Sequence, residues 1–188
     1  MHPSSTVHTD DVTPRPWRNG GGTTRELLAL PAGEAWRVRV SVADVVVDGP
    51  FSAFADVSRW FAVIDGAGVV LTVDGVERRC TIAGEPLAFA GDADTRARLI
   101  DGPTRDLNLM LRGIGGAMRS VVPGEAFRPG SRQCGLYATI AGELRTVPTS
   151  REAPMPPHAL RWWPAAPESL AFDGTGWWLG ADLADDDA

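Results

Sequence analysis

The 188-residue chain contains no lysine, so all 18 of its basic residues are arginine. This absence excludes the lysine-dependent phosphate-binding loop, and it excludes catalysis by a lysine Schiff base or general base. Histidine is also scarce, because only His2, His8 and His158 occur and none lies close to another. Metal sites of the histidine type need two or three histidines at close spacing, and the chain also lacks the G-x-S-x-G motif of a serine nucleophile. We therefore expect no metal and no other cofactor.

Cysteine and long hydrophobic runs are likewise in short supply. The two cysteines, Cys80 and Cys134, form no CxxC or zinc pattern and fit a reducing compartment. No apolar run reaches the 18 residues that suggest a membrane-spanning helix, and the start MHPSSTVHTDD lacks the regions of a secretory signal. The net charge of −6 makes nucleic acid and anionic membrane poor partners. We expect a cytoplasmic protein.

The residues that are present favour β-structure. In segment 36–43, Trp, Val, Val and Val alternate with Arg, Arg and Ser, and in segment 106–112 three leucines alternate with polar residues. A period of two is typical of a strand with one buried face. The 21 glycines and 15 prolines favour many turns, and Asp74-Gly75 predicts a tight hairpin. The sequence therefore predicts an all-β sandwich or barrel.

Strand candidates fall into two groups along the chain, with irregular segments at the ends and in the middle. No exact repeat relates the two groups, so the division is architectural. The predicted parts are a flexible N-terminal arm (1–13), a first half (14–112), an irregular junction (113–134), a second half (135–181) and an acidic tail (182–188).

A glycine run, Asn19-Gly20-Gly21-Gly22-Thr23-Thr24-Arg25-Glu26, is the most unusual local feature. Consecutive glycines let backbone N–H groups converge on an anion, and Arg25 with the threonine hydroxyls could add donors. The alternative is a flexible turn into a strand, in which Arg25 and Glu26 form an ordinary ion pair. Both interpretations remain open on the residues alone.

One face of the predicted strand at 106–112 carries Asp106, Asn108, Met110 and Arg112. If this face lines a barrel, its buried polar groups need partners. They could orient a polar ligand, or they could pair with Arg37 or Arg39 on a facing strand. The only two asparagines of the chain, Asn19 and Asn108, lie in this strand and in the glycine run.

Aromatic residues gather in two places. Phe51, Phe54 and Trp60 are predicted as core, with the apolar wall of a pocket as the alternative, and Arg59 beside them could reach a ligand or solvent. Two tryptophan pairs, Trp162-Trp163 and Trp177-Trp178, occur late in the chain. Because neighbouring strand residues face opposite ways, one ring of each pair is expected to face outward, to cover a sheet or form a dimer surface.

Four motifs in order resemble the HutD family, also called HutD/Ves, of bacterial histidine-utilisation gene clusters. They are PWRNGGGTTREL (16–27), WRVRVSVADV (36–45), DGPFSAF (48–54) and GPTRDLNLMLR (102–112). The resemblance implies a bicupin, with two cupin-like β-barrels packed as one compact unit and no metal. It also implies a role in histidine degradation as a small-molecule-binding, regulatory protein. Formate, N-formylglutamate and urocanate are the implied ligands.

Carried over by residue, the resemblance implies one ligand site. Its members are Asn19, Thr23, Arg25, Arg59, Asp106, Asn108 and Met110. The leading hypothesis is a metal-free protein that binds a small carboxylate and could form a homodimer. One alternative is an enzyme that acts on a small acid or amide with a buried carboxylate as base. Another is a ligand-free interaction module that uses the tryptophan-rich half.

Overall fold

The computed structural model describes residues 5–82, 84–146, 150–151 and 154–184, and these form an all-β structure, as predicted. Two compact units divide the chain: residues 13–113 form one, and residues 1–12 with 114–188 form the other. The one helix among the described residues is a short 3-10 turn at Thr9–Asp11. No helix in this part of the chain is long and apolar enough to cross a membrane.

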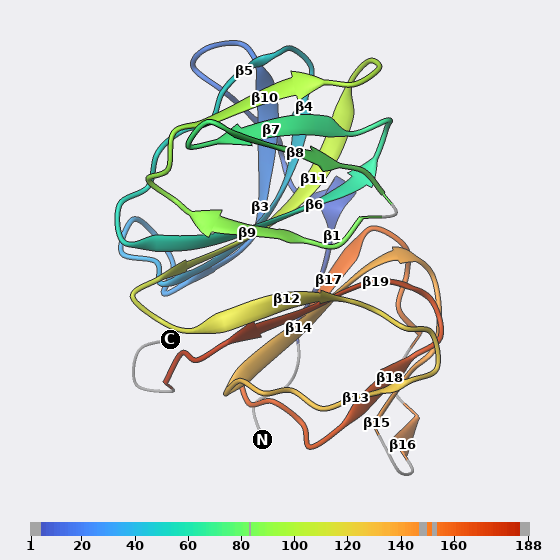
Figure 1. Ribbon diagram of the computed structural model, residues 1–188. Coiled ribbons are helices and arrows are strands. Elements are labelled where there is room, and N and C mark those ends of the chain that lie inside the picture. The colour runs from blue at the N-terminus through green and yellow to red at the C-terminus, as the bar shows by residue number, and fades with distance from the viewer. Residues whose placement is uncertain (1–4, 83, 147–149, 152–153, 185–188) are drawn as a thin grey trace. The chain divides into compact units, whose positions relative to one another are not determined.

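The unit of residues 13–113 contains two antiparallel sheets, seen in blue to yellow-green in Figure 1. The six-stranded sheet has the order β2-β3-β4-β11-β6-β9, and the four-stranded sheet has the order β5-β10-β7-β8. The strands of the six-stranded sheet are β2 (Arg15–Pro16), β3 (Gly22–Leu30), β4 (Val38–Val45), β11 (Thr104–Arg112), β6 (Val57–Asp65) and β9 (Leu87–Ala90). Those of the four-stranded sheet are β5 (Gly49–Pro50), β10 (Thr95–Leu99), β7 (Val69–Val73) and β8 (Val76–Cys80).

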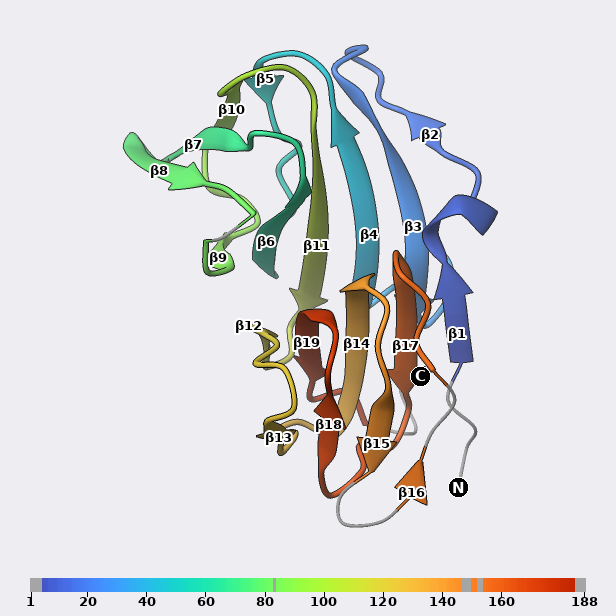
Figure 2. The same cartoon turned by 90° about the vertical axis from the view of Figure 1, so that its right-hand side faces the viewer.

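The long strands β3, β4 and β11 run side by side (Figure 2), and the predicted period of two determines their faces. Val40 and Leu109 pair across β4 and β11, and both are fully buried on one face. The opposite face packs toward the four-stranded sheet, where Phe61 of β6 joins an apolar cluster with Leu71 of β7 and Ala97 of β10. Part of the interior of this barrel is therefore filled by apolar side chains.

Two glycine-containing turns shape this unit. The predicted hairpin joins β7 to β8, with Asp74 and Gly75 both at positive φ (46° and 80°), the combination that a tight hairpin turn requires. At the start of β3, Gly22 packs so closely against β4 that a Cβ atom would overlap the carbonyl oxygen of Asp44. Glycine is needed there for space.

The second unit also contains two antiparallel sheets, of the orders β1-β17-β14-β19-β12 and β13-β18-β15-β16. The first sheet comprises β1 (Ser5–His8), β17 (Ala159–Trp163), β14 (Gln133–Ile140), β19 (Thr175–Ala181) and β12 (Gly116–Ser120). The second comprises β13 (Ala126–Phe127), β18 (Leu170–Phe172), β15 (Leu144–Thr146) and β16 (Ser150–Arg151).

Two segments without predicted strands contribute strands to this unit. Within the segment 1–13, predicted as a flexible arm, Ser5–His8 instead pairs with β17. The segment 113–134, predicted as irregular, contains β12 and β13 and the start of β14. The strands β1, β12 and β13 each pair with a strand far away in the sequence, so the local sequence pattern did not indicate them.

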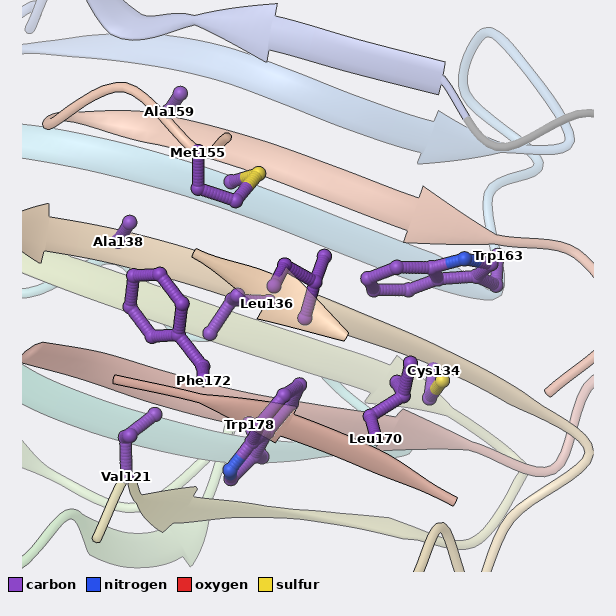
Figure 3. Packing of buried hydrophobic residues seen from close by; sticks show 11 residues of the cluster. Val121, Cys134, Leu136, Ala138, Met155, Ala159, Trp163, Leu170, Phe172 and Trp178 are labelled. Carbon is purple, nitrogen blue, oxygen red and sulfur yellow. The ribbon is translucent and has the colours of Figure 1, made fainter. Parts of the chain in front are cut away.

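The interior of the second unit is filled with side chains. Figure 3 shows Trp163, Trp178, Phe172 and Met155 packed with aliphatic residues of the same cluster. Trp162 and Trp177, expected to face outward, do lie on the other face of their sheet. They are nevertheless only 2% and 4% exposed, so no ring of either tryptophan pair is on the surface.

Candidate functional site

The unit of residues 13–113 contains a cavity of about 540 Å³ on the face of the six-stranded sheet that also carries Phe61. Strand register sets which side chains reach it. Met110 of β11 pairs with Arg39 of β4 and with Arg59 of β6, and Asn108 pairs with Ser41. All five of these side chains line the cavity. Alternation along three strands thus gathers polar groups next to the apolar core.

A chain of hydrogen bonds crosses the buried floor of the cavity. Nε and Nη2 of Arg59 both donate to Oδ1 of Asn108, at 3.0 and 2.7 Å. Nδ2 of Asn108 donates to Oδ2 of Asp106 at 2.5 Å. All three residues are at least 92% buried. Cation and carboxylate are therefore linked through a neutral amide and make no direct contact.

This chain leaves two polar atoms with capacity to spare. Nη1 of Arg59 has no hydrogen-bond partner among the described residues, and Oδ1 of Asp106 is buried with none. The Arg59 guanidinium also lies over the rings of Phe51 and Phe89, at 4.7 and 5.4 Å from their centroids. These aromatic faces stabilise the cation weakly and leave its free N–H group unpaired.

Burial perturbs both charged groups of the floor. Loss of solvation lowers the pKa of Arg59 to about 10, although Asp106 opposes that change, so the guanidinium stays protonated at neutral pH. Loss of solvation raises the pKa of Asp106 to about 7, although Arg59 and the Asn108 hydrogen bond oppose that change. Asp106 is consequently poised to gain or lose a proton near neutrality.

Further cations surround the floor. Arg39 is compensated, because its Nε donates to Oε2 of Glu26 at 2.7 Å. Arg15 and Arg18 lie at the exposed rim. The lining thus includes four arginines and one aspartate, in a protein whose net charge is −6. The cavity is a local positive region that is suited to an anion.

Aromatic side chains and the glycine run complete the wall. Trp17 is held by its Nε1, which donates to Oγ1 of Thr24 at 2.7 Å, and it makes an edge contact with Phe51 at 6.2 Å. The Asn19 side chain accepts from the backbone N–H of Gly21 at 3.0 Å. The glycine run therefore forms a hydrogen-bonded turn that carries Asn19 and Trp17 to the cavity.

The structure brings together five of the seven residues that the resemblance implied. Asn19, Arg59, Asp106, Asn108 and Met110 all line the cavity.

Thr23 and Arg25 lie on the opposite face of the sheet, because they alternate with Thr24, which does line the cavity. Both hydrogen-bond to Asp44, with Nη1 of Arg25 2.5 Å from its Oδ2. Arg105 contacts the other oxygen of Asp44 at 2.6 Å. Desolvation raises the pKa of Asp44, but the hydrogen bonds and charges of the two arginines outweigh it and leave that pKa below its ordinary value.

Several cavity residues were not singled out from the sequence, although a signal existed. Arg39 and Ser41 alternate with the buried valines of β4, so the period of two had placed them on the polar face. The partners predicted from the sequence for Asn108 and for Glu26 were both wrong. Asn108 pairs with Arg59 instead of Arg37 or Arg39, and Glu26 pairs with Arg39 instead of Arg25.

The chemistry available here is anion binding by a guanidinium, supported by neutral donors and one carboxyl group near its pKa. Within the described residues, no three His, Cys, Asp or Glu side chains come together in a group that could hold a metal ion.

Solved structures share this fold. The chain matches a conserved protein of unknown function from Pseudomonas aeruginosa PAO1 with a TM-score of 0.84 and 24% identity, over 97% of this chain and 100% of that one. It matches HutD from Pseudomonas fluorescens SBW25, in a structure described as the formate condition, with a TM-score of 0.81 and 29% identity, over 95% and 98%. Oxalate decarboxylase from Bacillus subtilis shares the fold alone, with a TM-score of 0.62 at 11% identity over 97% and 78%. The chain is a bicupin.

Sequence comparison identifies the family. The model of the HutD family matches residues 9–173, and the chain belongs to that family. Protein Ves of Cronobacter sakazakii is 29% identical over 155 residues, which are 82% of this chain and 83% of that protein. A 21.2 kDa protein of Pseudomonas putida, described by its position 3′ of hutC, is 36% identical over 109 residues, 55% of this chain and 56% of that protein.

Proposed function

We propose that the cavity binds a small carboxylate metabolite, and that Arg59 is the residue that holds it. The observation that carries the proposal is the open Nη1 of a buried guanidinium at a cavity floor. A guanidinium that meets a carboxylate forms charge-assisted hydrogen bonds, which are among the strongest available to a protein. No carboxylate of the described residues contacts Arg59 directly, so its charge is available to a ligand.

The surroundings favour a small organic anion over a bare inorganic ion. A volume of about 540 Å³ lies within the range of small-molecule sites. Phe51, Phe54 and Trp17 supply apolar walls, while Asn19 and Ser41 supply neutral polar groups. A carboxylate head beside Arg59 with a short organic body against the aromatic rings would use both kinds of lining.

Two relatives support this choice of ligand class and a role in histidine utilisation. One relative is a HutD protein whose structure is described as the formate condition, and another is described by its position beside hutC. Formate, N-formylglutamate and urocanate are therefore the first compounds to test. We place the protein in histidine utilisation as a regulatory binding protein in the cytoplasm that responds to the level of one such acid. The proposal requires no metal.

Thermal unfolding of chelator-treated protein tests the proposal with formate, N-formylglutamate, glutamate, urocanate, histidine and imidazole. A ligand at a hundredfold excess over its Kd stabilises the folded state by about 2.7 kcal/mol, which raises Tm by roughly 5–10 °C for a chain of this size. We expect the shift for one or more carboxylates. Imidazole carries no carboxylate and should produce none.

Two arginine variants locate the site. Arg59→Met removes the cation from the floor and should abolish the shift, whereas Arg25→Met removes a cation of the opposite face and should leave it unchanged. A shift that survives Arg59→Met would place the ligand elsewhere. A shift lost only in Arg25→Met would support the glycine-run site that the sequence suggested.

A second candidate function follows from the buried Asp106 oxygen without a partner. A carboxylate with a pKa of about 7 can act as general base toward water that attacks a small acid or amide. Incubation of the metal-free protein with N-formylglutamate, followed by NMR detection of free formate, tests this activity. Turnover that disappears in Asp106→Asn would support an enzyme, and stable substrate would leave binding alone.

A further inference from the structure

We propose that binding of a carboxylate beside Arg59 is coupled to uptake of one proton by Asp106, so that the site binds its ligand more tightly as the pH falls. This inference rests on the proposed function and adds to it a regulatory input, the proton. It makes Asp106 a positioning residue that acts on the ligand through the charge balance of the cavity floor.

The charge balance is the first step. Among the described residues, Arg59 and Asp106 are the only charged side chains that are fully buried, with exposures of 8% and 1%. They form a balanced set of one cation and one anion joined through Asn108. A carboxylate ligand at Nη1 of Arg59 would add a second anion to this set. Two carboxylates that share one buried cation favour a state in which one of them is protonated.

Hydrogen bonding decides which carboxylate takes the proton. Asp106 receives a single hydrogen bond, on Oδ2, and its Oδ1 has no partner. A ligand on Arg59 would accept from a charged donor, which favours its ionised form. Protonation of Asp106 would remove the negative charge from a residue that lines the cavity and has one oxygen without a partner. The proton therefore belongs on Asp106, and the already raised pKa of this group is consistent with that placement.

The other groups that act on Asp106 do not substitute for it. The Asp44 carboxylate on β4 raises the pKa of Asp106 from the opposite face, but Arg25 and Arg105 hold it ionised. Burial raises the pKa of the Cys80 thiol on β8 to about 11, so it stays neutral across the range of interest.

Three further arginines lie near the floor. Arg39 on β4 faces Arg59 and is already bonded to Glu26 of β3. Arg15 and Arg18 lie at the exposed rim. Asp106 is thus the group whose protonation can follow the ligand near neutral pH. The affinity should fall about fivefold from pH 7 to pH 8, as free Asp106 becomes ionised, and about tenfold for each further unit of pH.

Isothermal titration calorimetry with sodium formate as the probe tests the coupling. Titrations at pH 8 in HEPES and in Tris differ only in the heat of buffer ionisation, so the difference in observed enthalpy counts protons. For the wild type we expect uptake approaching one proton per formate, and a formate affinity at pH 8 about fivefold below that at pH 7. Asp106→Asn should bind formate with no proton uptake and with an affinity independent of pH.

The control is Asp44→Asn, which removes a carboxyl group of the opposite face and should leave the proton uptake at the wild-type value. Formate binding without proton uptake in the wild type would overturn the inference while leaving the proposed function intact, even if Asp106→Asn failed to fold. Uptake that persists in Asp106→Asn would also overturn it. No formate binding by the wild type at any pH from 5.5 to 8 would overturn the inference for this probe, whereas the proposed function would fail only if no carboxylate of the thermal-unfolding panel raised Tm.

Discussion

Replacement of Asp106 by asparagine should make the ligand-free protein more stable above neutral pH, although it removes a buried charge opposite a buried arginine. Asparagine takes the place of the protonated aspartic acid and cannot ionise. The folded-state pKa of Asp106 is raised from 3.8 to about 7, chiefly by loss of solvation. The folded protein therefore binds this proton more tightly than the unfolded chain, and the resulting stability is full below pH 4 and lost as the pH rises through 7.

The size of the effect follows from the two pKa values. The interval from 3.8 to about 7 is roughly a thousandfold in proton affinity, and each factor of ten corresponds to about 1.4 kcal/mol. The wild type should therefore lose about 4 kcal/mol between pH 4 and pH 8 that the Asp106→Asn variant keeps. That amount is a large part of the 5–15 kcal/mol typical of a folded protein, so it is readily measured.

Urea unfolding followed by circular dichroism at pH 4.5, 6, 7 and 8.5 measures the difference. The free energy of unfolding of Asp106→Asn, relative to wild type, should increase steadily with pH up to about 8. Asp44→Asn is the matched control, because the pKa of Asp44 is lowered and its contribution is lost only as the pH falls below its ordinary value of 3.8. Its difference from wild type should change much less than that of Asp106→Asn from pH 5 to 8.5, because Asp44 is the smallest of the influences on the pKa of Asp106. Parallel stability curves for Asp106→Asn and wild type would show that Asp106 is not buried as an ionised carboxyl group, and would refute the reasoning.

Three substitutions test the framework that holds the site. Leu109→Ala, at a fully buried position on β11, should lower the free energy of unfolding by about 2–5 kcal/mol in urea titrations. Gly22→Ala should destabilise by about 1–3 kcal/mol in the same assay, because the added methyl group meets the Asp44 carbonyl. Gly75→Ala places a Cβ at positive φ in open space and should lower the free energy of unfolding by about 1 kcal/mol in the same assay. Any rise of Tm with formate should be retained in this variant. A Gly22→Ala protein as stable as wild type would contradict the close packing of β3 on β4.

The fold class was predictable because the period of two is written into single strands. The valines of β4 and the leucines of β11 marked the buried face of each strand without knowledge of its partner. The same alternation placed Asp106, Asn108 and Met110 together. The strand at Ser5–His8 was not predictable, because its character comes from pairing with β17, about 150 residues away.

The site was predictable only in part, for a related reason. The residues Thr23 and Thr24 are identical, and which of them faces the cavity depends on the register that β3 adopts beside β4 after the glycine turn. Arg59 offers a comparable case. Its neighbours Ser58 and Trp60 gave no sign that a guanidinium would be buried, since its acceptor, Asn108, lies 49 residues further along the chain.

Asn108 has a consequence beyond its hydrogen bonds, because its neutral amide keeps the Arg59 guanidinium and the Asp106 carboxyl group from direct contact. An aspartate in its place would form a direct ion pair with Arg59, and the cavity would then no longer attract an anionic ligand. A leucine in its place would leave the buried charges of Arg59 and Asp106 without this hydrogen-bond partner. The amide accepts at one end and donates at the other, so two opposite charges stay in one polar chain without neutralising each other on contact. A single uncharged side chain thus leaves the positive charge of this cavity available to an anion in a protein that is acidic as a whole.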